Sequence, residues 1–230
     1  MDGILLVDKP QGWTSHDVVA KIRGIIKYET GQKVKIGHTG TLDPMATGLL
    51  VLVLGSYTKR AGEFSKLDKT YEAEVTLGKT STTGDREGEI TQKSAHEPSL
   101  GEIQSALNKF TGEIMQMPHR FSAIKIDGQR AYKAARAGQE LKIEPREVTI
   151  YGITDVDYGY PTLKFIAKVS SGTYIRSLAE DIGEALGTGA YLSALRRTKV
   201  GKFGISEAIN MDDLGIAKIM AGVLQELPKR

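Results

Sequence analysis

Apolar and polar residues follow one another in patterns that change from segment to segment along the chain. Residues 4–7 form a short apolar run typical of a buried strand. Thr14 with Asp17 three residues later resembles a capping box, and apolar residues at helical spacing extend the expected helix to about Lys27. The polar residues 28–35 that follow are expected to form a loop.

The middle of the chain alternates between strand and helix patterns. Residues 49–54 are an apolar run suited to a central strand, and a Gly-rich segment with Asp43 leads into it. Residues 71–77 alternate apolar and polar side chains, the period of a strand with one buried face. Ser99 with Glu102 opens a second capped helix.

Two further strand patterns, at residues 148–156 and 163–169, precede a helix marked by Leu178, Ile182 and Leu186 and closed by Gly187 as a left-handed cap. Strands and helices mix without a strict βαβ rhythm. The fold class expected is therefore α+β, a mixed and largely antiparallel sheet with helices packed on it.

Composition narrows the class of protein. No apolar run approaches the roughly 20 residues that span a bilayer, and charge follows the first apolar residues too soon for a secretory signal, so a cytoplasmic protein away from the membrane is expected. The chain has no cysteine, which excludes disulfides, thiolate nucleophiles and cysteine-ligated zinc.

The distribution of charge says more than the net charge of +3. Residues 119–146 hold seven Lys or Arg against three acidic residues, and a second basic cluster lies near the carboxyl end. Separated basic patches suit a folded polyanion, although solvated surface charge is the plain alternative. The second cluster comprises Arg196, Arg197, Lys199 and Lys202.

No cofactor or metal is expected. The sequence lacks a phosphate-binding Gly-rich loop, and its four histidines are not set at ligand spacing. Asp85, Glu87 and Glu89 miss the spacing of a calcium loop and are interpreted as turn residues. Asp43, which precedes a proline in a Gly-rich run, could on the same reasoning simply organise a turn.

Several separate motifs carry a family resemblance. Residues 37–48, Gly-His-Thr-Gly-Thr-Leu-Asp-Pro-Met-Ala-Thr-Gly, resemble the catalytic motif of the TruB family of tRNA pseudouridine synthases. Residues 6–15 resemble its Lys-Pro motif and 68–71 its tyrosine motif, while 172–176 with 195–197 resemble its arginine and leucine motifs. The order agrees, and the similarity runs from about Gly3 to about Asn210.

This resemblance implies a pseudouridine synthase fold and conversion of uridine to pseudouridine at position 55 in the T-loop of tRNA, without cofactor or metal. Asp43 would be the nucleophile, because a carboxylate can form a covalent intermediate and leave again. Arg176 would pair with Asp43 and keep it ionised. Tyr71 would stack on the target base and help to remove its carbon-5 proton.

The substrate-binding residues that the resemblance implies include His38, which would contact the nucleotides displaced when the base flips out. A histidine bonded to its own loop is the alternative. Leu195 would form a wall of the pocket. Weaker candidates, for phosphate contact or support of the pocket, are Lys9, Lys59 and Tyr174.

The expected organisation is one catalytic domain over residues 1–230, acting as a monomer. A basic, thumb-like insertion at about 115–147 would close over the T-arm of tRNA. In it Pro118-His119-Arg120-Phe121-Ser122-Ala123 departs from the family's Pro-Pro-x-Tyr-Ser-Ala, and Ser81 stands where a threonine is usual. Only about one helix fits after Asn210, so the family's carboxyl-terminal PUA domain is expected to be absent.

Two other classes remain open from the residues alone. A non-catalytic RNA-binding or tRNA-folding protein would share the basic patches, but Asp43, Tyr71 and Arg176 together argue against it. A glycoside hydrolase needs two carboxylates at the scissile bond, and no second acid stands near a comparable motif.

Overall fold

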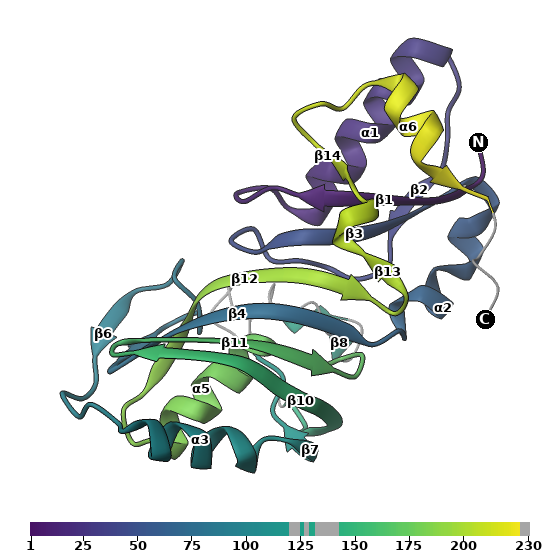
Figure 1. Cartoon of the computed structure of the whole chain (residues 1–230). Coiled ribbons are helices and arrows are strands. Elements are labelled where there is room, and N and C mark those ends of the chain that lie inside the picture. The colour runs from purple at the N-terminus through teal and green to yellow at the C-terminus, as the bar shows by residue number, and fades with distance from the viewer. Residues whose placement is uncertain (120–124, 127–128, 132–142, 226–230) are drawn as a thin grey trace. The chain divides into compact units, whose positions relative to one another are not determined.

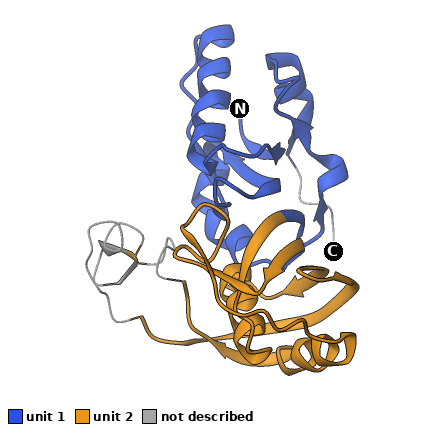
Figure 2. Cartoon of the chain, turned by 90° about the vertical axis from the view of Figure 1, so that its left-hand side faces the viewer, with its two compact units in different colours: residues 1–71, 196–230 blue, residues 72–195 orange. Residues whose placement is uncertain are grey.

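The computed structural model describes residues 1–119, 125–126, 129–131 and 143–225. The chain divides into two compact units, residues 1–71 with 196–230 and residues 72–195 (Figure 2). No helix in these described ranges is long and apolar enough to cross a membrane. The expectation of one domain over residues 1–230 stays a prediction.

The first unit contains a sheet in which β1 pairs antiparallel with β3 and parallel with β14 (Figure 1). β2 and β15 add antiparallel pairs to β3 and β1, and the end of β12 runs parallel to β3. The strands are β1 (Gly3–Lys9), β2 (Ile36–His38), β3 (Thr47–Leu54), β12 (Ala190–Val200), β13 (Phe203–Gly204), β14 (Ile209–Asn210) and β15 (Val223–Leu224), with β12 beginning in the second unit.

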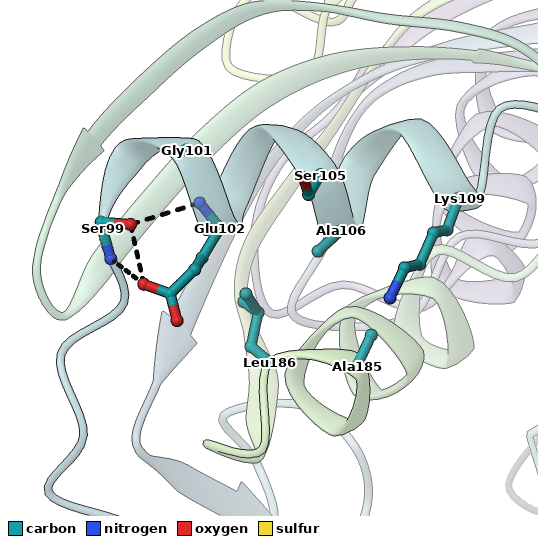
Figure 3. A pocket seen from close by; sticks show the side chains of 8 residues that line it. All are labelled: Ser99, Gly101, Glu102, Ser105, Ala106, Lys109, Ala185 and Leu186. Atoms are coloured by element: carbon teal, nitrogen blue, oxygen red, sulfur yellow. Dashed lines mark hydrogen bonds between the residues drawn. The ribbon is translucent and has the colours of Figure 1, made fainter.

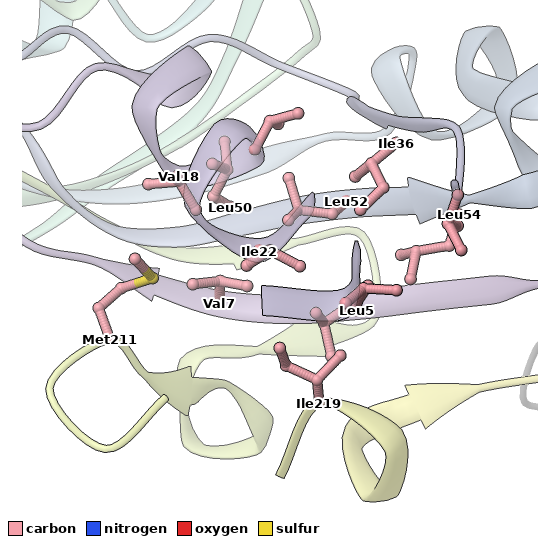
Figure 4. Close-up of a cluster of buried hydrophobic side chains, with 13 residues drawn as sticks. Leu5, Val7, Val18, Ile22, Ile36, Leu50, Leu52, Leu54, Met211 and Ile219 are labelled. Carbon is pink, nitrogen blue, oxygen red and sulfur yellow. The ribbon is translucent and has the colours of Figure 1, made fainter. Parts of the chain in front are cut away.

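Both faces of β1 and β3 are buried, which explains why these strands read as continuous apolar runs. On one face Leu5, Leu50 and Leu52 pack against α1 and α6 (Figure 4). On the other face Ile4 and Val51 pack against side chains that include Phe64 and Phe203. The helical elements of the unit are α1 (Ser15–Thr30), η1 (Gly55–Arg60), α2 (Ala61–Ser65), η2 (Ile205–Glu207) and α6 (Ile216–Gly222).

Helix α1 begins where the sequence predicts and ends later. The Thr14 side chain accepts a hydrogen bond from Asp17 N–H, and Asp17 returns the contact, so the capping box is confirmed. The helix continues to Thr30 and ends at Gly31, whose φ is 71°. The prediction that a loop begins at Tyr28 is wrong by one turn, because Gly31, rather than the polar residues before it, supplies the left-handed cap.

The second unit contains the strand order β12-β4-β11-β10-β7 and two short hairpins, β5 with β6 and β8 with β9 (Figure 1). β10 pairs antiparallel with both β11 and β7. The strands are β4 (Lys69–Leu77), which begins in the first unit, β5 (Lys79–Ser81), β6 (Ile90–Gln92), β7 (Gly112–Gln116), β8 (Lys125–Ile126), β9 (Gln129–Arg130), β10 (Arg146–Gly159) and β11 (Thr162–Val169). The mixed, mostly antiparallel α+β architecture is confirmed.

Alternation along β4 and β11 buries every second side chain, as the sequence predicts. The helices of this unit are α3 (Leu100–Lys109) and α5 (Ile175–Ala185), each with an apolar buried face. The capping box of Ser99 with Glu102 is present, and Gly187, at φ 68°, follows the end of α5 as expected. Helix α5 begins at Ile175, earlier than its apolar pattern indicates, and so includes Arg176.

A shallow recess lies between α3 and the end of α5 (Figure 3). Ser99 and Glu102 on its rim hydrogen-bond each other in the capping box. The residues that the sequence singles out for chemistry lie elsewhere.

Candidate active site

The segment that carries Asp43 joins β2 to β3. Asp43 is half-buried, and its main-chain carbonyl accepts a hydrogen bond from Ala46 N–H at 3.1 Å, which closes a turn. Thr39 fastens the start of the segment, because its N–H and its hydroxyl both donate to Val51 O, at 3.0 and 3.2 Å. Asp43 therefore stands on a loop that enters a buried strand, as predicted.

Ser15, at the first residue of α1, holds the residue before Asp43. Its hydroxyl accepts a hydrogen bond from Leu42 N–H at 2.9 Å and donates to Leu42 O at 3.2 Å. On the other side of Asp43, Gly12 N–H donates to Pro44 O at 2.8 Å. The turn between β1 and α1 therefore holds the Asp43 loop by hydrogen bonds to Leu42 and Pro44. We call this set of contacts the clasp.

Lys9 is fully buried, and its ammonium points into the same clasp. It donates to the main-chain carbonyls of Pro10, Trp13 and Pro44, at 2.9, 2.6 and 3.4 Å. A buried ammonium is tolerated only when such acceptors surround it. These contacts give Lys9 a part in shaping the loop after Asp43, and its contact with a tRNA phosphate stays a prediction.

Tyr71 lies on the buried face of β4 with Lys69, because side chains two residues apart in a strand share a face. Both residues are less than one tenth exposed. The Lys69 ammonium donates to Ser65 O at 2.6 Å. Burial, together with the nearby Arg197 guanidinium, lowers the pKa of Lys69 to about 8, and Asp68 opposes that shift. The sequence did not single out Lys69.

His38 and Lys59 differ in exposure. His38 is the last residue of β2, is half-buried and pairs with Leu52 in the ladder. Lys59 is exposed in η1, a position open to a phosphate. Their roles toward RNA stay predictions.

The four residues of the carboxyl-terminal basic cluster differ in exposure and in their hydrogen-bond partners. Arg197 is 2% exposed and donates to main-chain carbonyls, so its assignment to a surface patch is wrong. Arg196 is partly exposed and forms a bidentate pair with Asp8, at 2.7 and 3.2 Å. Lys199 and Lys202 are exposed. Alternation along β12 sends neighbouring arginines in different directions, which a count of charges does not detect.

In the second unit Arg176 lies in the first turn of α5 and is 6% exposed. Its Nη1 donates to Thr83 O at 3.1 Å and to Asp85 Oδ2 at 3.3 Å. Asp43 belongs to the first unit, and the pairing of Arg176 with Asp43 stays a prediction.

Asp85 is a buried partner of Arg176 that the sequence interpretation missed. It does occupy a turn, in which Oδ1 accepts from Thr83 Oγ1 at 2.6 Å and from Glu87 N–H at 3.0 Å. It is also 3% exposed and pairs with Arg176. The interpretation of Asp85 as a turn residue is therefore incomplete, because it leaves out this buried ion pair. Leu192 in β12 fixes the loop, since its N–H donates to Gly84 O at 3.0 Å.

Tyr174 and Leu195 are both half-buried. Gln116, at the end of β7, brackets Tyr174 from the interior: its side-chain amide donates to Tyr174 O at 3.0 Å and accepts from Tyr174 N–H at 2.8 Å. The buried Gln116 thereby fixes Tyr174, the residue immediately before the first residue of α5. A lone glutamine in a strand gives no sequence signal for this contact.

Most of the expected basic insertion lies outside the described residues. Of its basic side chains only Arg146, exposed at the start of β10, is described, and Phe121 falls outside as well. His119, which departs from the family motif, is buried with Nε2 3.6 Å from Glu180 Oε2. Among the described residues, no three His, Asp or Glu side chains gather as potential metal ligands.

Comparison with known proteins gives consistent matches. The model of the TruB family pseudouridylate synthase N-terminal domain matches residues 27–175, and that of the tRNA pseudouridylate synthase B C-terminal domain matches residues 176–226. The tRNA pseudouridine synthase B of Streptomyces coelicolor is 46% identical over 93% of this chain and 72% of its own length. That of Thermobifida fusca is 44% identical, over 93% and 74%.

Among solved structures, a Cbf5-Nop10-Gar1 complex contains a similar chain. It is 33% identical, with a TM-score of 0.70 over 92% of this chain and 53% of that chain. A chain in the structure of an H/ACA RNP bound to a substrate RNA containing 2'-deoxyuridine is 30% identical to this chain, with a TM-score of 0.67. This chain therefore spans about half the length of the matching chains in these two structures and about 70% of the length of the two synthases.

Proposed function

Because this chain belongs to the TruB family of tRNA pseudouridine synthases, we propose that it isomerises uridine 55 in the T-loop of tRNA, with Asp43 as the nucleophile. The observation that carries the proposal is the clasp around Asp43. Buried groups hold the residues on either side of this half-buried carboxylate, at Leu42 and Pro44, which prepares one acid for attack in a fixed position.

The reaction balances without an added reagent. The bond between N1 of uracil and C1′ of ribose breaks, the uracil rotates, and C5 bonds to C1′. The proton leaves C5 and one is bound at N1, so product and substrate are isomers. The Asp43 carboxylate forms one covalent bond, at C1′ or at C6 of uracil, and releases it again before product leaves.

Arg176 is assigned the role of cation beside Asp43. A guanidinium close to a carboxylate favours the ionised and therefore nucleophilic form. Asp85 and Thr83 O support this role, because they fix the guanidinium of Arg176 in the interior of its own unit. Asp85 acts through Arg176 and is a positioning residue.

Tyr71 is assigned contact with the target base. Its ring lies on a buried strand face, where it can stack on uracil, and its hydroxyl suits transfer of the C5 proton. Leu195 and Tyr174, both half-buried, would wall the pocket.

The target base must leave the folded T-loop before reaction, at a cost of about a few kcal/mol. His38 is proposed to contact the displaced nucleotides, since stacking on an aromatic ring contributes about 1 to 3 kcal/mol per base. The exposed Lys59, Lys199 and Lys202 would contact phosphates of the T-arm, and Lys9 would support the Asp43 loop from within. The protein would act as a monomer without a metal or cofactor.

Pseudouridine mapping of unmodified tRNA tests the position. After incubation with the protein, modification is expected at position 55, and a tRNA with cytidine at that position should gain none in its T-loop. Modification at another tRNA position would keep the reaction class and overturn the position. Binding of tRNA without any pseudouridine would favour the RNA-binding alternative.

A further inference from the structure

Arg197 is placed beside the Asp43 loop by strand pairing. The end of β12 runs parallel to β3, with Arg196 opposite Thr47 and Arg197 opposite Gly48. Gly48 has a φ of 102°, and a Cβ there would come within 2.3 Å of Arg197 O. Glycine at this position therefore lets the strand that carries Arg197 approach the residues that follow Asp43.

The guanidinium of Arg197 joins the start of the Asp43 loop to the first residues of β3. Its Nε donates to Leu49 O at 2.8 Å, and its Nη2 donates to Gly40 O at 3.0 Å. Gly40 precedes Asp43 and Leu49 follows it. One planar side chain thus fixes the separation of two main-chain carbonyls, and the rigid fork of donors in arginine allows this where a single ammonium does not.

Burying this charge carries a cost. Arg197 is 2% exposed, its acceptors Leu49 O and Gly40 O are neutral carbonyls, and the Lys69 ammonium lies close enough for the two cations to repel each other. Buried charges destabilise a fold unless their hydrogen bonds are well made. An apolar side chain could fill the same space without that penalty, so the useful property of Arg197 is its pair of directed hydrogen bonds.

We infer that Arg197 is a positioning residue for catalysis: it fixes the distance between Gly40 in the loop and Leu49 in β3, and so aims the Asp43 carboxylate. This role rests on the proposed function, in which Asp43 is the nucleophile. Arg197 itself touches neither base nor phosphate in this account, which separates it from the basic residues expected to bind tRNA.

The test compares Arg197→Lys with Val200→Ala. Arg197→Lys keeps the charge and loses the fork, whereas Val200 is buried in the same strand and its apolar side chain makes no hydrogen bond to the loop. Single-turnover pseudouridine formation at saturating tRNA gives the rate, a tRNA titration gives the Kd, and amide hydrogen exchange of residues 39–48 reports the loop directly.

Arg197→Lys is expected to slow the single-turnover rate by about 100-fold, the loss that a nucleophile displaced by about 1 Å can cause. Its tRNA Kd should stay within about twofold of wild type, since no phosphate contact is removed. Exchange of the loop amides should accelerate. Val200→Ala should lower the Tm while its rate and loop exchange remain near wild type.

A wild-type rate in Arg197→Lys, or unchanged exchange of the loop, would overturn the inference. So would a loss confined to the tRNA Kd, because it would make Arg197 an RNA contact. If the wild-type protein forms no pseudouridine, the proposed function fails instead. Hydrogen exchange still decides whether Arg197 fixes the conformation of the loop. Arg197→Gln, without the charge, should accelerate exchange in the same segment.

Discussion

Arg176 Nη1 donates to Asp85 Oδ2 at 3.3 Å, and both side chains are almost completely buried, at 7% and 4% exposure. The carboxylate also accepts hydrogen bonds from Thr83 and Glu87, so it is itself held in place. The cation assigned to the active site is therefore oriented by a fixed partner in its own unit.

Asp85→Asn should damage both stability and catalysis. Neutralising one member of a buried pair leaves the Arg176 charge uncompensated, and the free energy of unfolding should fall by about 3 kcal/mol. Because Arg176 would lose its orientation, the single-turnover rate should fall by about 10- to 100-fold. Urea unfolding and single-turnover assays measure the two effects. The exposed Glu89→Gln serves as the control and should change neither.

Ser15→Ala should loosen the Asp43 loop from the α1 side. The change leaves Leu42 N–H and O without the hydroxyl that serves both, at a cost of about 1 to 3 kcal/mol for buried groups. The rate should fall more than the affinity for tRNA. Ser65→Ala, at an exposed hydroxyl bonded to Gly62 O, is the matched control. Equal stability of the two variants would contradict the clasp.

Because of Lys69, the free energy of unfolding should change with pH in the alkaline range. Its pKa is lowered to about 8 in the folded protein from an ordinary value of 10.5, so between these values the unfolded chain binds more protons. The penalty of the buried charge is complete below pH 8 and disappears as the pH rises towards 10.5. The stability gained by Lys69→Met over wild type should therefore shrink from pH 8 to pH 10. Urea unfolding at pH 7.5, 9 and 10 would show a constant difference if Lys69 does not titrate in this way.

Binding of tRNA should weaken steeply as salt rises, because phosphate contacts release counterions. Lys59→Ala should reduce the slope of log K against log salt by about 1. Lys218→Ala removes a lysine that pairs with Asp213 and should leave the slope unchanged. Fluorescence titrations between low and physiological salt measure the slopes, and a flat response in wild type would exclude the electrostatic account.

Local patterns predicted much of the fold. The alternation along β4 and β11, the continuous apolar run in β3 and both capping boxes depend on neighbouring residues, and all are present. The predicted end of α1 is wrong because Gly31 ends the helix, whereas the polar residues before it continue the helix.

The site was predicted less completely, since its contacts join residues distant in sequence. Asp43 and Arg176 stand in recognisable motifs, but Asp85 looked like an ordinary turn residue and Gln116 carried no signal. The sequence alone groups Arg197 with the surface charges, because it does not show the register of β12 with β3, which decides the direction of the side chain. That register is a property of the folded sheet.

The central claim is that Asp43 is the nucleophile of a pseudouridine synthase. Single-turnover assays of wild type, Asp43→Asn and Asp43→Glu on unmodified tRNA test it most directly, with tRNA titrations as the control for binding. The account predicts pseudouridine with wild type only, a loss of at least about 10⁴-fold in Asp43→Asn, and tRNA affinity close to wild type in both variants. Pseudouridine formation by Asp43→Asn at a rate near that of wild type would contradict it.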